Sequence, residues 1–183
     1  MRRLVGIDPG LHGGFGVLDL EGGGGVIRVE LVPTPIVARI RVGARKPRNE
    51  YDPARMREVL ARVIDGRDPG IRHVEVVLEA QGARPGQGVA SSYKTGVGFG
   101  LWLGLVVGMR VAYRIVQPLA WKRHAGLVGQ DKRASRLRAQ ERFPALGVVA
   151  PADEGPAEGL LLAAYVAATR TEGSPDGQVA RPR

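Results

Sequence analysis

The chain of 183 residues has no cysteine and only three histidines, which stand far apart at positions 12, 73 and 124. Without cysteine it forms no disulfide bond and offers no thiolate ligand, so a cysteine-based zinc site is excluded. No stretch approaches the ~18 apolar residues of a membrane-spanning helix, so we expect no contact with a membrane. The N-terminus begins directly with a strand-like run rather than a signal peptide, which predicts a cytoplasmic protein.

Positive charge is in clear excess, because 27 Lys and Arg face 18 Asp and Glu, for a formal net charge of +9. Only four of the basic residues are lysines, and arginine is the better bidentate partner of phosphate groups. This composition favours nucleic acid as the partner. The alternative is that a high-GC genome or a hot habitat favours arginine; a single asparagine, Asn49, also suits a thermophile.

Apolar spacing predicts one domain over residues 1–170, followed by a flexible tail over 171–183. We expect strands at residues 3–8, 15–20, 26–32, 73–78 and 109–116, and helices at residues 53–64, 91–107, 118–124, 132–143 and 156–169. Residues 33–52 show no periodicity, are basic over 36–48, and predict a flexible loop. This order predicts an α/β fold, a mixed sheet with helices on its faces.

The predicted helix at 91–107 is rich in glycine, with Gly96, Gly98, Gly100 and Gly104. Each glycine costs a helix roughly 1 kcal/mol relative to alanine, but permits close contact between helices. The segment therefore predicts a packed interface rather than a solvated helix.

Acidic side chains stand at the ends of two predicted strands. Asp8 ends the first strand, and Glu79 ends the fourth and opens into a glycine-rich, basic segment. Unpaired carboxylates are costly to hold at the rim of a core, whereas a metal ion facing a polyanionic substrate would explain them. At the start of the last helix, Glu154 and Glu158 share a face if the helix begins by then; otherwise Asp153 or Glu154 is an N-cap.

Together these acids would form an oxygen-only site, which suits Mg²⁺ or Mn²⁺ rather than zinc. Two ions about 4 Å apart would clamp a scissile phosphate between an attacking water and the leaving oxygen. Asp153 and Glu154 also have a structural explanation, because acids at a helix N-terminus complement its dipole.

The ordered set of motifs resembles the RuvC-type Holliday-junction resolvases, in particular the phage-encoded branch, within the ribonuclease H-like superfamily. The resemblance spans most of residues 4–166. The matching pieces are residues 6–10, Glu79 with residues 82–88, residues 96–104, residues 118–122, residues 132–135 with Phe143 and Pro144, and residues 154–161.

The resemblance implies a five-stranded mixed sheet with catalytic acids from the first strand, the fourth strand and the last helix. On this basis Asp8, Glu79 and Glu158 are metal ligands and Glu154 is the fourth acid. Cellular members place the last two acids three residues apart, whereas Glu154 and Glu158 are four apart, so Asp153 stays a rival ligand.

The resemblance also implies contacts with DNA. Lys122 and Lys132 match positions that hold phosphate near the cut; the alternative for each is a solvated surface lysine. Further candidates are Arg84, Gln87, Ser91, Ser92, Tyr93, Lys94 and Arg133. Cellular members carry a wedging aromatic three residues after the strand-four glutamate; here that position is Gly82, and the nearest aromatic is Tyr93.

The function implied is a metal-dependent, structure-selective endodeoxyribonuclease that resolves four-way junctions, and other branched DNA, in recombination and repair. The setting would be the cytoplasm of a bacterial cell or a phage-infected host. Paired cuts require two sites, which predicts a C2 homodimer joined through the helix at 91–107. The alternatives are a flap or debranching nuclease of the same fold, a non-catalytic module that binds branched DNA, and an actin-like phosphotransferase.

Overall fold

The computed structural model describes residues 1–40, 42–43, 45–65, 70–82 and 86–169, so the predicted tail at 171–183 lies outside the described residues. The strands are β1 (Arg2–Asp8), β2 (Gly14–Leu20), β3 (Val26–Pro33), β4 (Ile36–Arg39), β5 (Arg48–Tyr51), β6 (His73–Glu79) and β7 (Ala112–Val116). The α-helices are α1 (Pro53–Ile64), α2 (Val89–Gly108), α3 (Pro118–His124), α4 (Lys132–Arg142) and α5 (Glu154–Thr169). Short 3₁₀ turns cover Pro144–Leu146 and Pro151–Asp153.

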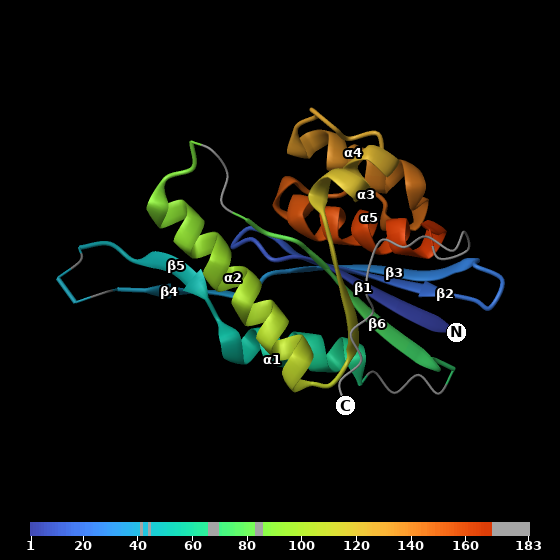
Figure 1. Ribbon diagram of the computed structural model, residues 1–183, viewed down its shortest axis with the longest axis horizontal. Coiled ribbons are helices and arrows are strands. Elements are labelled where there is room, and N and C mark those ends of the chain that lie inside the picture. The colour runs from blue at the N-terminus through green and yellow to red at the C-terminus, as the bar shows by residue number, and fades with distance from the viewer. Residues whose placement is uncertain (41, 44, 66–69, 83–85, 170–183) are drawn as a thin grey trace.

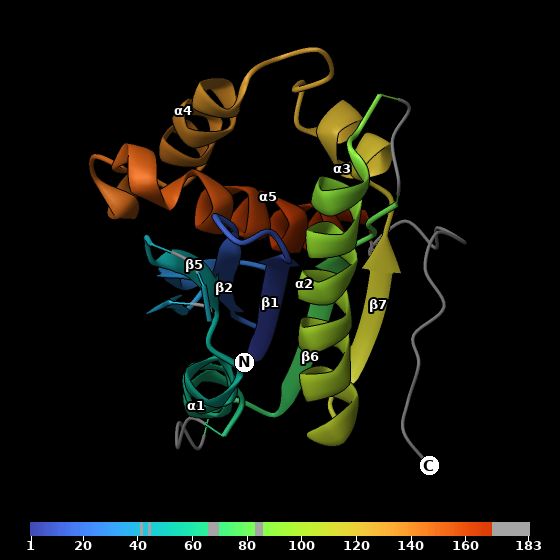
Figure 2. The ribbon, with the colours of Figure 1, turned by 90° about the vertical axis from the view of Figure 1, so that its left-hand side faces the viewer.

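Five strands form one mixed sheet in the order β3-β2-β1-β6-β7, in which β3, β2 and β1 pair antiparallel and β1, β6 and β7 pair parallel. Helices α3, α4 and α5 cover one face, and α1 and α2 cover the other (Figures 1 and 2). Each face has its own apolar cluster. The predicted mixed sheet, the opening meander and the flanking helices are thus confirmed.

Several helix starts follow from local sequence chemistry. Asp52 accepts a hydrogen bond from the Arg55 backbone N–H at 3.1 Å, and Pro53 takes the first helical position of α1. Asp131 caps α4 in the same way, with its side chain 3.0 Å from the backbone nitrogen of Ala134. Such caps satisfy backbone donors that the first helical turn leaves unpaired.

Two sequence predictions need correction. Residues 33–52 do not form only a loop, because β4 and β5 pair there as a separate two-stranded ribbon that projects from the body (Figure 1). The strand predicted from position 109 begins at Ala112, because Met109 caps α2 and Arg110 has a φ of 56° in the turn that follows.

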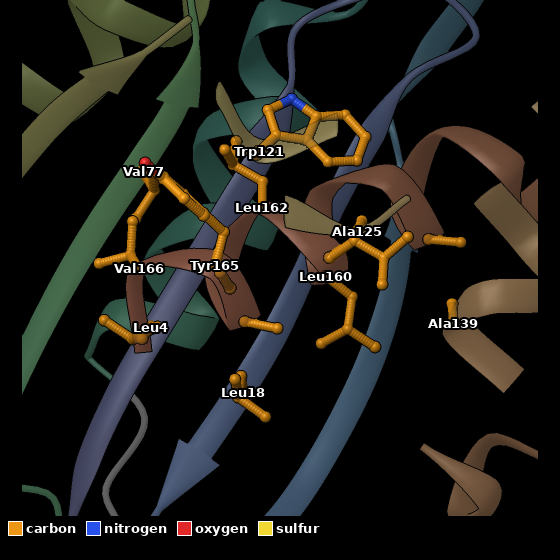
Figure 3. Close-up of a cluster of buried hydrophobic side chains, with 14 of the residues drawn as sticks. Leu4, Leu18, Val77, Trp121, Ala125, Ala139, Leu160, Leu162, Tyr165 and Val166 are labelled. Carbon is orange, nitrogen blue, oxygen red and sulfur yellow. The ribbon is translucent and has the colours of Figure 1, made fainter. Parts of the chain in front are cut away.

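The α5 helix lies unusually close to the sheet, because glycines face one another at the contact. A Cβ atom on Gly159 would lie 2.4 Å from the carbonyl oxygen of Gly6, and one on Gly16 would lie 2.4 Å from Leu160 backbone atoms. One turn earlier, a Cβ on Gly155 would lie 2.4 Å from the Cα of Gly13. Side chains of α5, including Leu160, Leu162 and Val166, fill the space beside this contact and belong to one buried apolar cluster with Trp121 and Leu4 (Figure 3).

We predict that Gly159→Ala lowers the free energy of unfolding. Forcing a methyl group against backbone costs up to about 3 kcal/mol, and alanine returns about 1 kcal/mol of helix propensity, for a net loss near 2 kcal/mol. Urea unfolding measures the change. The matched control is Gly22→Ala, where the added Cβ meets open space, and it should stay within about 0.5 kcal/mol of the native protein. Equal stability of the two variants would contradict the close contact.

Candidate active site

The ends of β1 and β6 bring two of the predicted acids together. The parallel register pairs Gly6 with Val77 and Ile7 with Leu78, so Asp8 and Glu79 follow next on neighbouring strands. Side chains alternate along a strand, and both acids therefore lie on the face covered by α5. Both are buried, with 8% of Asp8 and 6% of Glu79 exposed.

The third acid, Glu158, arrives from α5 and is 6% exposed. It directly precedes Gly159, whose close approach to Gly6 sets the helix against β1. The Ser135 hydroxyl donates a hydrogen bond to Glu158 Oε1 at 2.9 Å, and Lys122 Nζ lies 3.4 Å from the same oxygen. Helices α3 and α4 thus both supply partners that hold this carboxylate at the edge of the sheet.

Neutral donors hold Glu79. Trp121 Nε1 donates to Oε1 at 3.0 Å, and Gln81 Nε2 donates to Oε2 at 2.9 Å. Burial raises the pKa of Glu79, and the negative charges of Asp8 and Glu158 raise it further, against the opposing Trp121 hydrogen bond and the Lys122 charge. The charged form of Glu79 is therefore disfavoured in the absence of a cation.

The loop after β1 holds Asp8 and ties it to other parts of the fold. The Gly10 backbone N–H donates to Asp8 Oδ1 at 3.1 Å. The Tyr51 hydroxyl donates to the Pro9 carbonyl at 3.2 Å, and its pKa is raised to about 12 by burial and by the Asp8 charge. The middle of α2 closes over this point, since a Cβ on Gly98 would lie 2.2 Å from the Tyr51 hydroxyl oxygen.

The donor chemistry at this edge suits a hard divalent cation, because the acids offer oxygen ligands and repel one another. Their geometry is less complete. In the part of the chain that the structure describes, no three acidic or histidine side chains lie close enough together to hold a metal ion. The structure thus brings Asp8, Glu79 and Glu158 to one edge without gathering them into a ligand cluster.

Glu154 and Asp153, the two candidates for the fourth acid, lie in different elements. Helix α5 begins at Glu154, so Glu154 and Glu158 lie four residues apart within one helix and share a face. Asp153 belongs to the preceding 3₁₀ turn. Both rivals are half-buried, and the next residue, Gly155, rests on the backbone of His12 and Gly13 in the loop after β1.

The predicted DNA contacts fall in three places. Lys122 lies beside Glu158, Arg133 is exposed on α4, and Lys132 is the first residue of α4. Arg84 lies outside the described residues. The others surround the start of α2, where Ser92 is half-buried and Gln87 donates to the side chains of Ser91 and Thr95; the exposed members are Ser91, Tyr93 and Lys94.

Several described residues that contact the acids or their loop were not predicted, among them Trp121, Ser135, Gln81 and Tyr51. Trp121 and Ser135 lie within segments that carried the resemblance, next to or near the two lysines, and Gln81 is two residues after Glu79. Their position in those motifs was the available clue. Tyr51 had none, because it belongs to the segment predicted as a loop.

Comparison with solved structures identifies the same architecture elsewhere. Thermus thermophilus RuvC in complex with a Holliday junction substrate matches with a TM-score of 0.64 at 19% identity, covering 96% of this chain and 99% of that chain. Another Thermus thermophilus RuvC structure matches with a TM-score of 0.61, at the same identity and coverage.

The chain has a RuvC-type fold. No protein-family model and no curated protein sequence matches the chain. The RuvC-type sheet accounts for the placement of Asp8 and Glu79 at one edge, since parallel β1 and β6 end together there. Of the helices among the described residues, none is both long and apolar enough to cross a membrane.

The raised pKa of Glu79 predicts how stability changes with pH when no divalent metal is present. A carboxyl whose pKa is higher in the folded protein binds more protons when folded, so stability falls as the pH rises above its ordinary value of 4.5. Glu79→Gln should remove this fall and unfold at a higher temperature than the native protein at pH 7 in EDTA.

Thermal unfolding between pH 4 and pH 8 measures this effect, with the exposed change Glu141→Gln on α4 as the control for loss of one carboxylate. A Glu79→Gln variant that is less stable than the native protein at pH 7 in EDTA would contradict the unfavourable burial.

Proposed function

We propose that the protein is a metal-dependent endonuclease that cuts branched DNA, with the four-way junction as its main substrate. One observation carries the proposal: three buried carboxylates lie at one edge of a RuvC-type sheet. The net charge of +9 supports a polyanionic substrate. The RuvC neighbour in complex with a Holliday junction substrate supports the choice of junction.

In this proposal, Asp8, Glu79 and Glu158 hold Mg²⁺ or Mn²⁺, two ions to a site, with Glu154 or Asp153 as the fourth acid. The bound ions would supply Lewis-acid stabilisation of phosphate charge and activation of water. Lys122, which lies 3.4 Å from Glu158, would bind a phosphate oxygen next to the scissile bond.

Neighbouring side chains keep these acids in place. Trp121 and Gln81 fix the orientation of Glu79, and Ser135 fixes Glu158. Hydrogen bonds to metal-binding carboxylates orient them toward the ion, and losing such a partner typically costs 10–100-fold in metal affinity or activity.

We expect Asp8→Asn to bind junction DNA as the native protein does and to lose cleavage by at least about a hundredfold, since even the partners behind metal ligands matter by 10–100-fold. The control is Asp65→Asn, an exposed change at the end of α1. Binding is measured in Ca²⁺ or EDTA, and cleavage in Mg²⁺ and in Mn²⁺. Undiminished cleavage by Asp8→Asn would show that the site is elsewhere. Native protein that binds junctions without cutting them would favour the non-catalytic module.

A flap or debranching nuclease is the second candidate. Gly82 is exposed and has no side chain to wedge into a junction centre, which favours a wider substrate range. Cleavage of synthetic four-way, three-way, flap and linear duplex DNAs by one preparation separates the two candidates, because a junction resolvase cuts the four-way junction fastest and in pairs.

Paired cutting requires two sites, and α2 offers a surface for a second copy. Gly96, Gly100, Gly104 and Gly108 follow at intervals of four along one side of the helix, and a Cβ on any of them would meet nothing within 4 Å. Unlike Gly98, these glycines therefore pack against no neighbouring segment in the part of the chain that the structure describes. We propose that they allow close contact between the α2 helices of a C2 homodimer.

Gly100→Leu should leave the fold intact, since the position faces open space, and should prevent dimerisation. Ala54→Leu, which adds the same side chain to an exposed position of α1, is the control. Sedimentation velocity measures the oligomeric state. On a plasmid that extrudes a cruciform, the native dimer should give linear product and Gly100→Leu nicked circles. A native protein that sediments as a monomer under cleavage conditions would contradict the dimer.

A further inference from the structure

A groove of about 410 Å³ lies between the β4–β5 ribbon and the first half of α2. This volume falls in the range of about 300–1,000 Å³ that is usual for small-ligand sites. It also lies apart from the three carboxylates, none of which lines it. The groove is therefore separate from the carboxylate site.

Positive charge dominates its walls. Arg39 and Arg48 face it from the ribbon and Lys94 from α2, and all three are exposed. Glu50 also lines it and offsets part of this charge. Arginine binds phosphate oxygens through a planar fork of donors, so the wall suits a nucleic-acid backbone.

An aromatic side chain stands among these cations. Tyr93 lines the groove from the first turns of α2 and is 72% exposed, although a tyrosine normally buries much of its ring. Asn49 lines the groove from β5 and adds an amide that can both donate and accept hydrogen bonds. A free aromatic face next to phosphate-binding cations is the arrangement that binds single-stranded nucleic acid, because every base can stack on it.

Tyr51 and the loop after β1 join the groove to the carboxylate site. Tyr51 lines the groove, and its hydroxyl donates to the carbonyl of Pro9, the neighbour of Asp8. Leu11, from the same loop, lines the groove as well. A DNA strand in the groove would therefore pass beside the loop that carries Asp8.

We propose that this groove binds an unpaired nucleotide of single-stranded DNA, with the base stacked on Tyr93 and the adjoining phosphates on Arg39, Arg48 and Lys94. The inference rests on the proposed function only in taking DNA as the substrate. It gives the protein an aromatic contact near a branch point that position 82, a glycine, does not provide.

The test measures binding of a fluorescein-labelled oligo(dT) strand and of a duplex of equal length, in EDTA. Tyr93→Ala should weaken oligo(dT) binding about tenfold, as loss of one base stack does, and Tyr93→Phe should stay within about twofold of native. Arg48→Ala should weaken binding and reduce the slope of log K against log salt by about 0.7. The control, Arg57→Ala, removes an exposed arginine of α1 that does not line the groove, and should leave both values in place.

Three results would overturn the inference: native oligo(dT) affinity in both Tyr93→Ala and Arg48→Ala, equal loss for strand and duplex, or a Tyr93→Ala variant that has become monomeric. The first of these, with metal-dependent junction cleavage intact, would leave the proposed function standing. The converse result is a native protein that cuts no DNA while the groove variants still lose oligo(dT) binding. That result would support the nucleotide-binding groove and contradict the proposed nuclease function.

Discussion

The close contact between α5 and strands β1 and β2 is the constraint on which the site depends. Gly159 meets Gly6 backbone to backbone, and one turn earlier Gly155 meets Gly13. Each of these two helix glycines directly follows a glutamate, Glu154 or Glu158. The glycines thus fix the height of the helix above the sheet, and the same turns carry the two acids toward the ends of β1 and β6. A larger residue at either glycine would lift the acids away from Asp8 and Glu79 together.

Buried charge in the described residues serves two separate purposes. Arg3 and Asp19 pair through two bonds of 2.7 Å, and Arg114 pairs with Glu75, all within the sheet. In such pairs the free-energy cost of desolvating the two charges roughly equals the gain from their attraction. Each pair is electrically neutral, so it does not attract a charged ligand. At the other end of β1 and β6 the acids repel one another, and burial raises the pKa of Glu79. A fold that accepts this cost at one edge, while neutralising charge elsewhere, is typical of a functional site.

Local sequence patterns predicted most of the strands and helices. The features that were not predicted depend mostly on contacts between elements that are distant in the sequence. Alternating apolar runs predicted the five strands, and the resemblance to the RuvC-type resolvases implied that Asp8 and Glu79 would lie at one edge of the sheet. The β4–β5 ribbon was not predicted, because its residues are mostly exposed and lack an apolar face. Trp121 and Ser135 became partners of the acids only through the packing of α3 and α4 over α5, which no spacing along the chain encodes. Metal binding and the dimer both stay predictions.

The loop at residues 9–13 joins Asp8 to the β4–β5 ribbon. Its Gly10 N–H holds Asp8, its Gly10 carbonyl accepts a hydrogen bond from Thr34 at 3.1 Å, and its Pro9 carbonyl accepts one from Tyr51. Thr34 precedes β4 and Tyr51 ends β5, so both strands of the ribbon are tied at its base to the loop that positions Asp8. A two-stranded ribbon is marginally stable alone, and these bonds give it a fixed base. A displacement of the ribbon would therefore reach the Asp8 loop through these hydrogen bonds directly, and not through the apolar core.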